Sequence, residues 1–295
     1  MGSTYFPQVT NHLLRGKNSF KRLEIDMFSS LKGVMGEQVF KLAILSVLAL
    51  LTLFLCGILL SLVAYTDVNT FFSTLLSDEI LFAVRLSLIT ATTATIISMV
   101  IAIPVAYAIS QTSFLGKNII DTILDLPIVV SPIALGAALL VFFNTPLGSL
   151  VEKRFTGFVF EVPGIILAQF MVVNALAVRL LKSTFDSINP RYEQVGRTLG
   201  CSKLRVFFRV TLPLARNGLI AAGILTWARA IGEFGATVTL AGATKMKTET
   251  LPVAIFMNLA TANVEKAVAV IFILIAIAVI ALIILRKMTG TRERI

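Results

Sequence analysis

The chain has 295 residues, of which 57% are hydrophobic and only 14% are charged, and its formal net charge is +10. Soluble domains carry about 25% charged residues and about 45–50% apolar residues. The composition therefore excludes a soluble globular domain, a disordered chain and a fibrous repeat, and it predicts a membrane protein.

Charge-free stretches mark the apolar spans along the chain. A helix needs about 20 apolar residues to cross the hydrocarbon core of a bilayer. Stretches without Asp, Glu, Lys or Arg are 42–66, 86–116, 126–151, 162–178 and 267–285. A further apolar stretch, 217–244, holds Arg229 and Glu233 as its charged residues. The sequence therefore predicts an all-α membrane protein with six transmembrane helices.

The basic residues give these spans an orientation. Connections on the side of the N-terminus hold 18 Lys and Arg, and those on the other side hold five. Cytoplasmic loops of membrane proteins are enriched in Lys and Arg, so we expect both termini in the cytoplasm. The positive charge is then a topology signal, and no nucleic-acid partner is expected. We divide the chain into a cytoplasmic N-terminal segment, 1–40, and a transmembrane domain, 41–290.

Prolines and charges inside the spans allow two interpretations each. Pro104, Pro127 and Pro132 lie in or at the edges of the second and third spans, where they indicate either bent, pore-lining helices or ordinary irregular packing. Arg229 and Glu233 are four residues apart, so they can pair on one helix face. Each charge alone would cost about 2.5–3.5 kcal/mol at the bilayer centre. The pair is either part of a polar pathway or gate, or a structural pair near the outer interface.

Motifs for catalysis or metal binding are scarce. Asp121 and Asp125 are two carboxylates without a histidine or third ligand nearby in sequence, so they indicate flanking charges or partners of basic neighbours. Cys56 and Cys201 fall in distant segments, and a disulfide is not expected. The sequence lacks G-x-x-x-x-G-K-[ST] and H-E-x-x-H. We therefore expect no metal site, no cofactor and no enzymatic activity, and any use of ATP requires a partner with a nucleotide site.

The connection 183–213 is the most distinctive segment. Asn189 is a good N-cap and Pro190 suits the first position of a helix. Gly200 is a plausible end for that helix, and Ser202 would cap a second one. Pro213 is expected to end the second helix before the fifth span. These signals favour a rigid helical hairpin on the cytoplasmic face over a solvated loop.

The same segment resembles the EAA motif, E-A-A-x-x-x-G-x(9)-I-x-L-P, of permease subunits of binding-protein-dependent ABC importers. Gly200 occupies the glycine, Val210 the isoleucine, and Leu212 and Pro213 the closing pair. The spacing between these positions matches the motif. The resemblance implies a type I ABC importer permease fold.

The first three positions of the motif depart from the pattern. Gln194, Val195 and Gly196 stand where Glu-Ala-Ala is usual, and Glu193 lies one place earlier. The resemblance nevertheless implies that Pro190–Leu199 is a coupling helix that docks in a groove of a cytoplasmic ATPase. The residues it implies for ATPase coupling are Pro190, Glu193, Gln194, Gly196, Arg197, Thr198, Leu199, Gly200, Cys201 and Ser202.

A second run narrows the branch of the family. Residues 227–237 read W-A-R-A-I-G-E-F-G-A-T and are similar to a run in permeases for molybdate, tungstate and sulfate. Residues 248–255 and 114–117 look more like the molybdate/tungstate branch. The resemblance implies a transmembrane subunit that imports molybdate or tungstate by alternating access. A sulfate, thiosulfate or other ABC importer permease is an alternative, and so is an ion-coupled secondary transporter.

The resemblance also implies the surroundings of the chain. It predicts a homodimer, a multi-pass protein of the cytoplasmic membrane in contact with lipid. Two copies of an ABC ATPase would bind ATP and Mg, and an extracytoplasmic oxyanion-binding protein would deliver the cargo. A membrane-embedded enzyme is a further alternative, and it would need a polar catalytic constellation that the spans do not display.

Overall fold

The computed structural model describes residues 37–64, 68–113, 115–154 and 157–289, and the regular elements in them are all helices. The chain divides into two units, Met1–Tyr65 and Thr66–Ile295. The described part of the first unit is the helix Glu37–Ala64, which is long and apolar enough to cross a membrane. Most of the predicted N-terminal segment, residues 1–36, lies outside the described residues.

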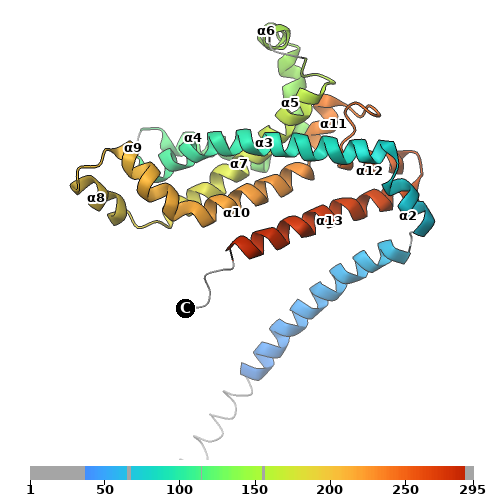
Figure 1. Ribbon diagram of the computed structural model, residues 1–295, viewed down its shortest axis with the longest axis horizontal. Coiled ribbons are helices and arrows are strands. Elements are labelled where there is room, and N and C mark those ends of the chain that lie inside the picture. The colour runs from blue at the N-terminus through green and yellow to red at the C-terminus, as the bar shows by residue number, and fades with distance from the viewer. Residues whose placement is uncertain (1–36, 65–67, 114, 155–156, 290–295) are drawn as a thin grey trace, which may run out of the picture. The chain divides into compact units, whose positions relative to one another are not determined.

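The second unit is built from helices of very different lengths (Figure 1). In chain order they are α2 (Val68–Leu75), α3 (Asp78–Gln111), α4 (Lys117–Val129), α5 (Pro132–Phe143), α6 (Pro146–Arg154), α7 (Val162–Asp186), α8 (Arg191–Thr198), α9 (Lys203–Val206), the π-helix η1 (Phe207–Thr211), α10 (Leu212–Ile231), α11 (Gly235–Ala241), α12 (Leu251–Ala260) and α13 (Val264–Thr289). The helices α8 and α9 lie at one end of the unit, and α2 and α12 lie at the other (Figure 1).

Several helices match the predicted spans. The helix Glu37–Ala64 and the helices α3, α7 and α13 are each long and apolar enough to cross a membrane. Two bent pairs also pass the test, α4 with α5 at 109° and the helix ending at Ile231 with α11 at 56°. The described residues therefore hold four such helices, or up to six if each bent pair is one span. The predicted number of six is the upper value of this range.

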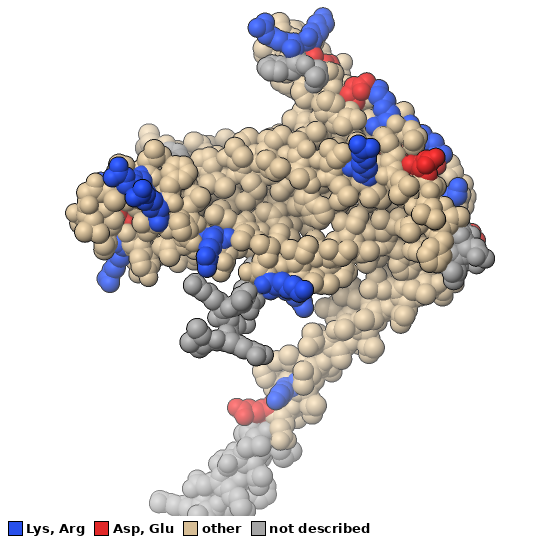
Figure 2. Space-filling view, in the orientation of Figure 1, with Lys and Arg blue, Asp and Glu red and all other residues tan. Residues whose placement is uncertain are grey.

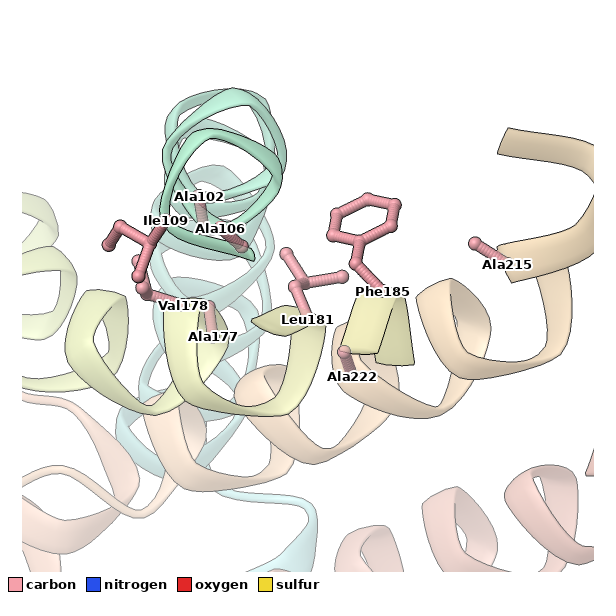
Figure 3. Packing of buried hydrophobic residues seen from close by; sticks show 9 residues of the cluster. All are labelled: Ala102, Ala106, Ile109, Ala177, Val178, Leu181, Phe185, Ala215 and Ala222. Carbon is pink, nitrogen blue, oxygen red and sulfur yellow. The ribbon is translucent and has the colours of Figure 1, made fainter. Parts of the chain in front are cut away.

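The packing core lies where α3, α7 and α10 meet (Figure 3). Its buried members are Ala102, Ala106, Ile109, Ala177, Val178, Leu181, Phe185, Ala215 and Ala222. Lipid supplies no hydrophobic driving force between spans, so small residues and close van der Waals packing hold such helices together. Gly218 shows how close α10 comes to α7, because a Cβ atom there would lie 2.2 Å from Thr184 Cγ2.

The expectation that Pro213 ends a helix is wrong. Residues 203–231 form one continuous helical segment, and Pro213 lies in the first turn of α10. The π turn just before it is closed by a hydrogen bond from Leu212 N to Phe207 O. A proline in a regular helix removes a donor and clashes with the preceding turn. The widened π turn accommodates the ring, so the helix continues to Ile231.

The prolines of the third span coincide with its sharp bend. The helix α4 ends at Val129, and Pro132 occupies the first turn of α5. Ser131 caps α5, because its Oγ accepts a hydrogen bond from Ala134 N at 3.3 Å. Pro104, by contrast, lies inside α3, which continues to Gln111. As a result α5 leaves the direction of the long helices and carries α6 away from them (Figure 1).

Candidate functional site

The hairpin that the sequence predicted is present and capped. Asn189 Oδ1 accepts a hydrogen bond from Arg191 N at 3.0 Å, and Pro190 is the capping position, one place before α8 begins. Gly200 follows α8 in the left-handed region, at φ +81°. Ser202 Oγ then accepts from Arg205 N at 3.4 Å and caps α9. The left-handed backbone conformation favours glycine at this position, which explains the residue.

The two faces of α8 differ in what they expose. Glu193 and Gly196, three residues apart, are half-buried, and a Cβ atom on Gly196 would lie 3.0 Å from Val206 Cγ2. The neighbouring positions Tyr192, Val195 and Leu199 expose apolar side chains, at 56%, 58% and 78%. The remaining coupling residues Gln194, Arg197, Thr198, Gly200 and Ser202 are exposed, and Cys201 is half-buried. The hairpin therefore presents a predicted docking face outward and packs its inner face on the bundle.

A cleft of about 570 Å³ separates the hairpin from the end of α3. Its lining includes Tyr107 and Gln111 of α3, Glu193 and Arg197 of α8, and Phe207 of η1. Basic side chains lie at this end of the unit, charged side chains of both signs lie at the other end, and the long sides between them are largely without charge (Figure 2). This distribution fits an apolar membrane belt with the hairpin on its water-facing side.

Arg229 and Glu233 form the predicted ion pair. Arg229 Nη1 lies 2.7 Å from Glu233 Oε2, and their side chains are 39% and 1% exposed. Glu233 Oε1 also accepts a hydrogen bond from Ala236 N at 3.0 Å. Glu233 lies in the break between α10 and α11, so its carboxylate joins the end of one helix to the first turn of the next. This geometry supports a structural role for Glu233 in joining the two helices. The guanidinium of Arg229 remains partly exposed.

A second charged group links α4 to α7. Arg179 Nη1 lies 2.8 Å from Asp121 Oδ1, and the same guanidinium donates hydrogen bonds to both carboxylate oxygens of Asp125. The interpretation of these aspartates as partners of a basic neighbour is therefore confirmed. The sequence did not reveal that the partner was Arg179, which lies more than 50 residues away in another span. In the part of the chain that the structure describes, no group of three His, Cys, Asp or Glu side chains could hold a metal ion.

The connection between α11 and α12 carries charges that the sequence analysis did not single out. Lys245 Nζ lies 2.9 Å from Glu79 Oε1, and this hydrogen bond raises the pKa of Lys245. Glu249 is fully buried, and its Oε2 accepts from Met246 N at 3.1 Å. Burial raises the pKa of the Glu249 carboxyl, and the neighbouring Glu79 raises it further. A glutamate in a polar loop gives no sequence signal of such burial.

These features together define a class of protein. The described chain is all-helical, carries several apolar spans and presents a capped hairpin at one end of its bundle, as a membrane-embedded transport subunit would. Residues 98–289 match the family of binding-protein-dependent transport system inner membrane components. The chain belongs to this family and is a multi-pass membrane protein.

Relatives within the family are similar over most of the chain. The probable molybdenum ABC transporter permease of Haloferax volcanii is 34% identical over 81% of this chain and 89% of its own length. The molybdenum transport system permease of Escherichia coli K12 is 34% identical, over 71% and 93%. The molybdate/tungstate transport system permease of Pyrococcus furiosus is 31% identical, over 76% and 84%.

A solved structure shows the same fold. A chain of a bacterial alginate ABC transporter, crystallised with an alginate pentasaccharide-bound periplasmic protein, aligns with a TM-score of 0.69. The alignment covers 89% of this chain and 96% of that one at 18% identity. Identity this low supports the common fold and no more.

Proposed function

We propose that this chain is the transmembrane subunit of an ABC importer that carries molybdate or tungstate into the cell. The observation that carries the proposal is the 34% identity, over most of the chain, to permeases that are named for molybdenum transport. We propose that a separate ATPase binds ATP and Mg, and the lack of a G-x-x-x-x-G-K-[ST] motif in this sequence supports that part of the proposal. Sulfate is the second candidate cargo, because the run 227–237 resembles sulfate permeases as well.

The outer face of α8 is the proposed docking surface for that ATPase. Tyr192, Val195 and Leu199 expose apolar side chains at helical spacing, and α8 lies at one end of the unit. A short helix that presents such anchors suits a hydrophobic groove on a partner. In the proposed topology the six spans place both termini and this surface in the cytoplasm, and the connections at the opposite end face the oxyanion-binding protein.

Transport requires two states of the bundle. We propose that two copies of this chain enclose one pathway and that each receives one ATPase subunit through α8. Closure of the ATPase dimer around ATP moves the two hairpins together, and this movement favours the outward-open state. Release after hydrolysis restores the inward-open state. A difference in contact energy between the two states is sufficient to drive the change.

We propose that the partly exposed Arg229 lines the transport pathway and contacts the passing oxyanion. Its pairing with the buried Glu233 fixes the guanidinium and lowers the net charge that a passing oxyanion meets. A fully paired cation would attract an anion weakly, so it can bind the anion briefly and release it. This role suits a pathway, where tight binding would slow transport.

Reconstitution in liposomes tests the proposal. The chain is combined with its ATPase and with the binding protein, and uptake of molybdate, tungstate and sulfate is measured with and without ATP. We expect ATP-dependent uptake of molybdate or tungstate. Uptake that needs neither ATPase nor nucleotide would establish a secondary transporter instead, and stimulation by sulfate alone would establish the alternative cargo.

A pair of variants tests the docking surface. Val195→Asp places a charge at the centre of the apolar face of α8, so the ATPase should no longer co-purify with the membrane subunit. Val195→Ile keeps the apolar character at similar volume and should preserve the complex. If both variants retain the ATPase, the surface lies elsewhere.

A further inference from the structure

One carboxylate lies where the hairpin meets two long helices. Glu193, in the first turn of α8, accepts a hydrogen bond on Oε1 from Thr211 Oγ1 at 2.6 Å. Tyr107 OH, on α3, lies 3.2 Å from Oε2 and 3.4 Å from Oε1 of the same carboxylate. A single side chain on the hairpin therefore contacts both α3 and the segment that leads into α10.

Both donors are held firmly in the bundle. Thr211 is 1% exposed and ends η1, the π turn that precedes α10. The Tyr107 ring packs 4.6 Å from the ring of Phe207 and 5.6 Å from that of Phe185, measured between ring centroids. Phe185 in turn belongs to the core formed by α3, α7 and α10. The hydroxyl groups that reach Glu193 therefore have fixed positions relative to the core.

The arrangement assigns Glu193 to the inner face of α8. It is half-buried, as Gly196 is, whereas the apolar side chains of the docking surface are exposed. A carboxylate accepts hydrogen bonds and donates none when ionised, and charge-assisted bonds are about twice as strong as neutral ones. Both neighbours of Glu193 are hydroxyl donors, so they complement its chemistry. An inward carboxylate of this kind positions the helix and does not contact the ATPase directly.

A continuous helical segment connects this contact to the far end of α10. From Lys203 the helical segment runs through η1 and α10 to Ile231, close to the Arg229–Glu233 pair. Displacement of α8 pulls on Thr211 through Glu193, and Thr211 lies at the base of α10. Single π turns inside α-helices are frequent at functional sites. A hairpin without this link would be joined to the spans through its chain ends and apolar contacts.

We propose that Glu193 is a positioning residue that ties the coupling helix to α3 and α10 and thereby converts hairpin movement into movement of the spans. The proposal rests on the proposed function, because it deepens the role of α8 in an ATP-driven importer. It separates two duties within one short helix: the outer apolar face binds the ATPase, and the inner carboxylate transmits the movement. The carboxylate that the EAA pattern places at position 194 is not needed for this duty.

The test uses variants that remove one donor at a time. Thr211→Val and Tyr107→Phe each delete a hydroxyl group with little change in volume, and Glu193→Ala deletes the acceptor. Glu193→Gln keeps an amide oxygen that can accept the hydrogen bond from Thr211. Its defect should therefore be much smaller than that of Glu193→Ala. Thr122→Val is the matched control, since it removes a hydroxyl group from an exposed side chain of α4 that bonds to Asn118 O in its own helix.

The main readout is the number of oxyanions transported for each ATP hydrolysed by the complete complex in liposomes, with molybdate as the probe. Thr211→Val and Tyr107→Phe should each lower this ratio about five-fold, the factor that corresponds to the net value of one hydrogen bond. Glu193→Ala should lower it about ten-fold or more. The ATPase should co-purify with all variants, and ATP hydrolysis should persist. Loss of folding or of docking would lower transport and hydrolysis together and leave the ratio unchanged.

A second measurement does not depend on the cargo. Hydrogen–deuterium exchange of the α8 amides in the full-length chain should increase about five-fold in Thr211→Val and Tyr107→Phe and stay unchanged in Thr122→Val. A wild-type complex that transports no oxyanion with ATP would overturn the proposed function, and the exchange rates would still test the link. Wild-type ratios and exchange in both donor variants would overturn the inference. So would loss of the ATPase in Glu193→Ala alone, because Glu193 would then be a docking residue.

Discussion

The ion pair between Arg229 and Glu233 makes the sharpest energetic prediction. The perturbations are Arg229→Ala, Glu233→Ala and the double variant. Glu233→Ala removes the 2.7 Å ion pair and the 3.0 Å hydrogen bond from Ala236 N, and it leaves both donors without this acceptor. Removal of one partner of a buried pair costs about 3–5 kcal/mol. The 39% exposure of Arg229 reduces this cost because water can solvate the guanidinium, so we expect about 3 kcal/mol.

Arg229→Ala should be similarly costly, because Glu233 is 1% exposed and would keep a charge with one backbone donor as its remaining partner. The double variant removes both charges, so its loss of unfolding free energy should be well below the sum of the two, by about 2–3 kcal/mol. Denaturant unfolding of the purified chain in detergent measures these values. Arg85→Ala, at an exposed arginine of α3, is the control and should change stability by less than about 0.5 kcal/mol.

The same variants decide whether Arg229 serves the pathway. A stable double variant whose oxyanion uptake falls about ten-fold or more would support a pathway role. A stable double variant with full uptake would show that the pair is structural and dispensable. If the double variant loses as much unfolding free energy as the two single variants together, the reasoning is refuted. Strict additivity would mean that the two charges do not interact.

Further predictions follow from glycines and a buried acid. Gly200→Val should uncouple ATP hydrolysis from uptake, because φ is +81° there, and Gly200→Asn should be tolerated. Gly218→Ala should destabilise the chain in denaturant unfolding, since its Cβ would lie 2.2 Å from Thr184 Cγ2; Gly223→Ala, with 3.8 Å of room, should not. The raised pKa of Glu249 means that the folded chain holds this proton more tightly than the unfolded chain. Melting temperatures should therefore fall as pH rises above the ordinary glutamate range, and Glu249→Gln should flatten this dependence.

Local signals in the sequence predicted the hairpin well. Asn189, Gly200 and Ser202 act through bonds to residues at most a few places away, so their roles follow from neighbouring residues alone. Pro213 was misjudged because the π turn before it depends on how the whole segment packs into the bundle. The prolines of the third span indicated a bend between α4 and α5, but they did not predict its angle of 109°.

Long-range partners could not be predicted in the same way. Arg179 joins Asp121 and Asp125 across two spans, and Glu193 joins Tyr107 across 86 residues. Nothing in the spacing of a single sequence reports which helices become neighbours. The burial of Glu249 has the same origin, because an acidic residue in a connecting loop is ordinarily solvated.

The sequence by itself determined that the chain lies in a membrane, since charge-free stretches of about 20 residues have no other stable environment. It also determined the family through the spacing of the hairpin motif, and the family model and relatives confirm it. The tertiary structure alone decided which face of α8 points outward and which contacts α3 and α10. That decision depends on helix packing between residues far apart in the chain, where close approach of small side chains, and not local propensity, selects the neighbours.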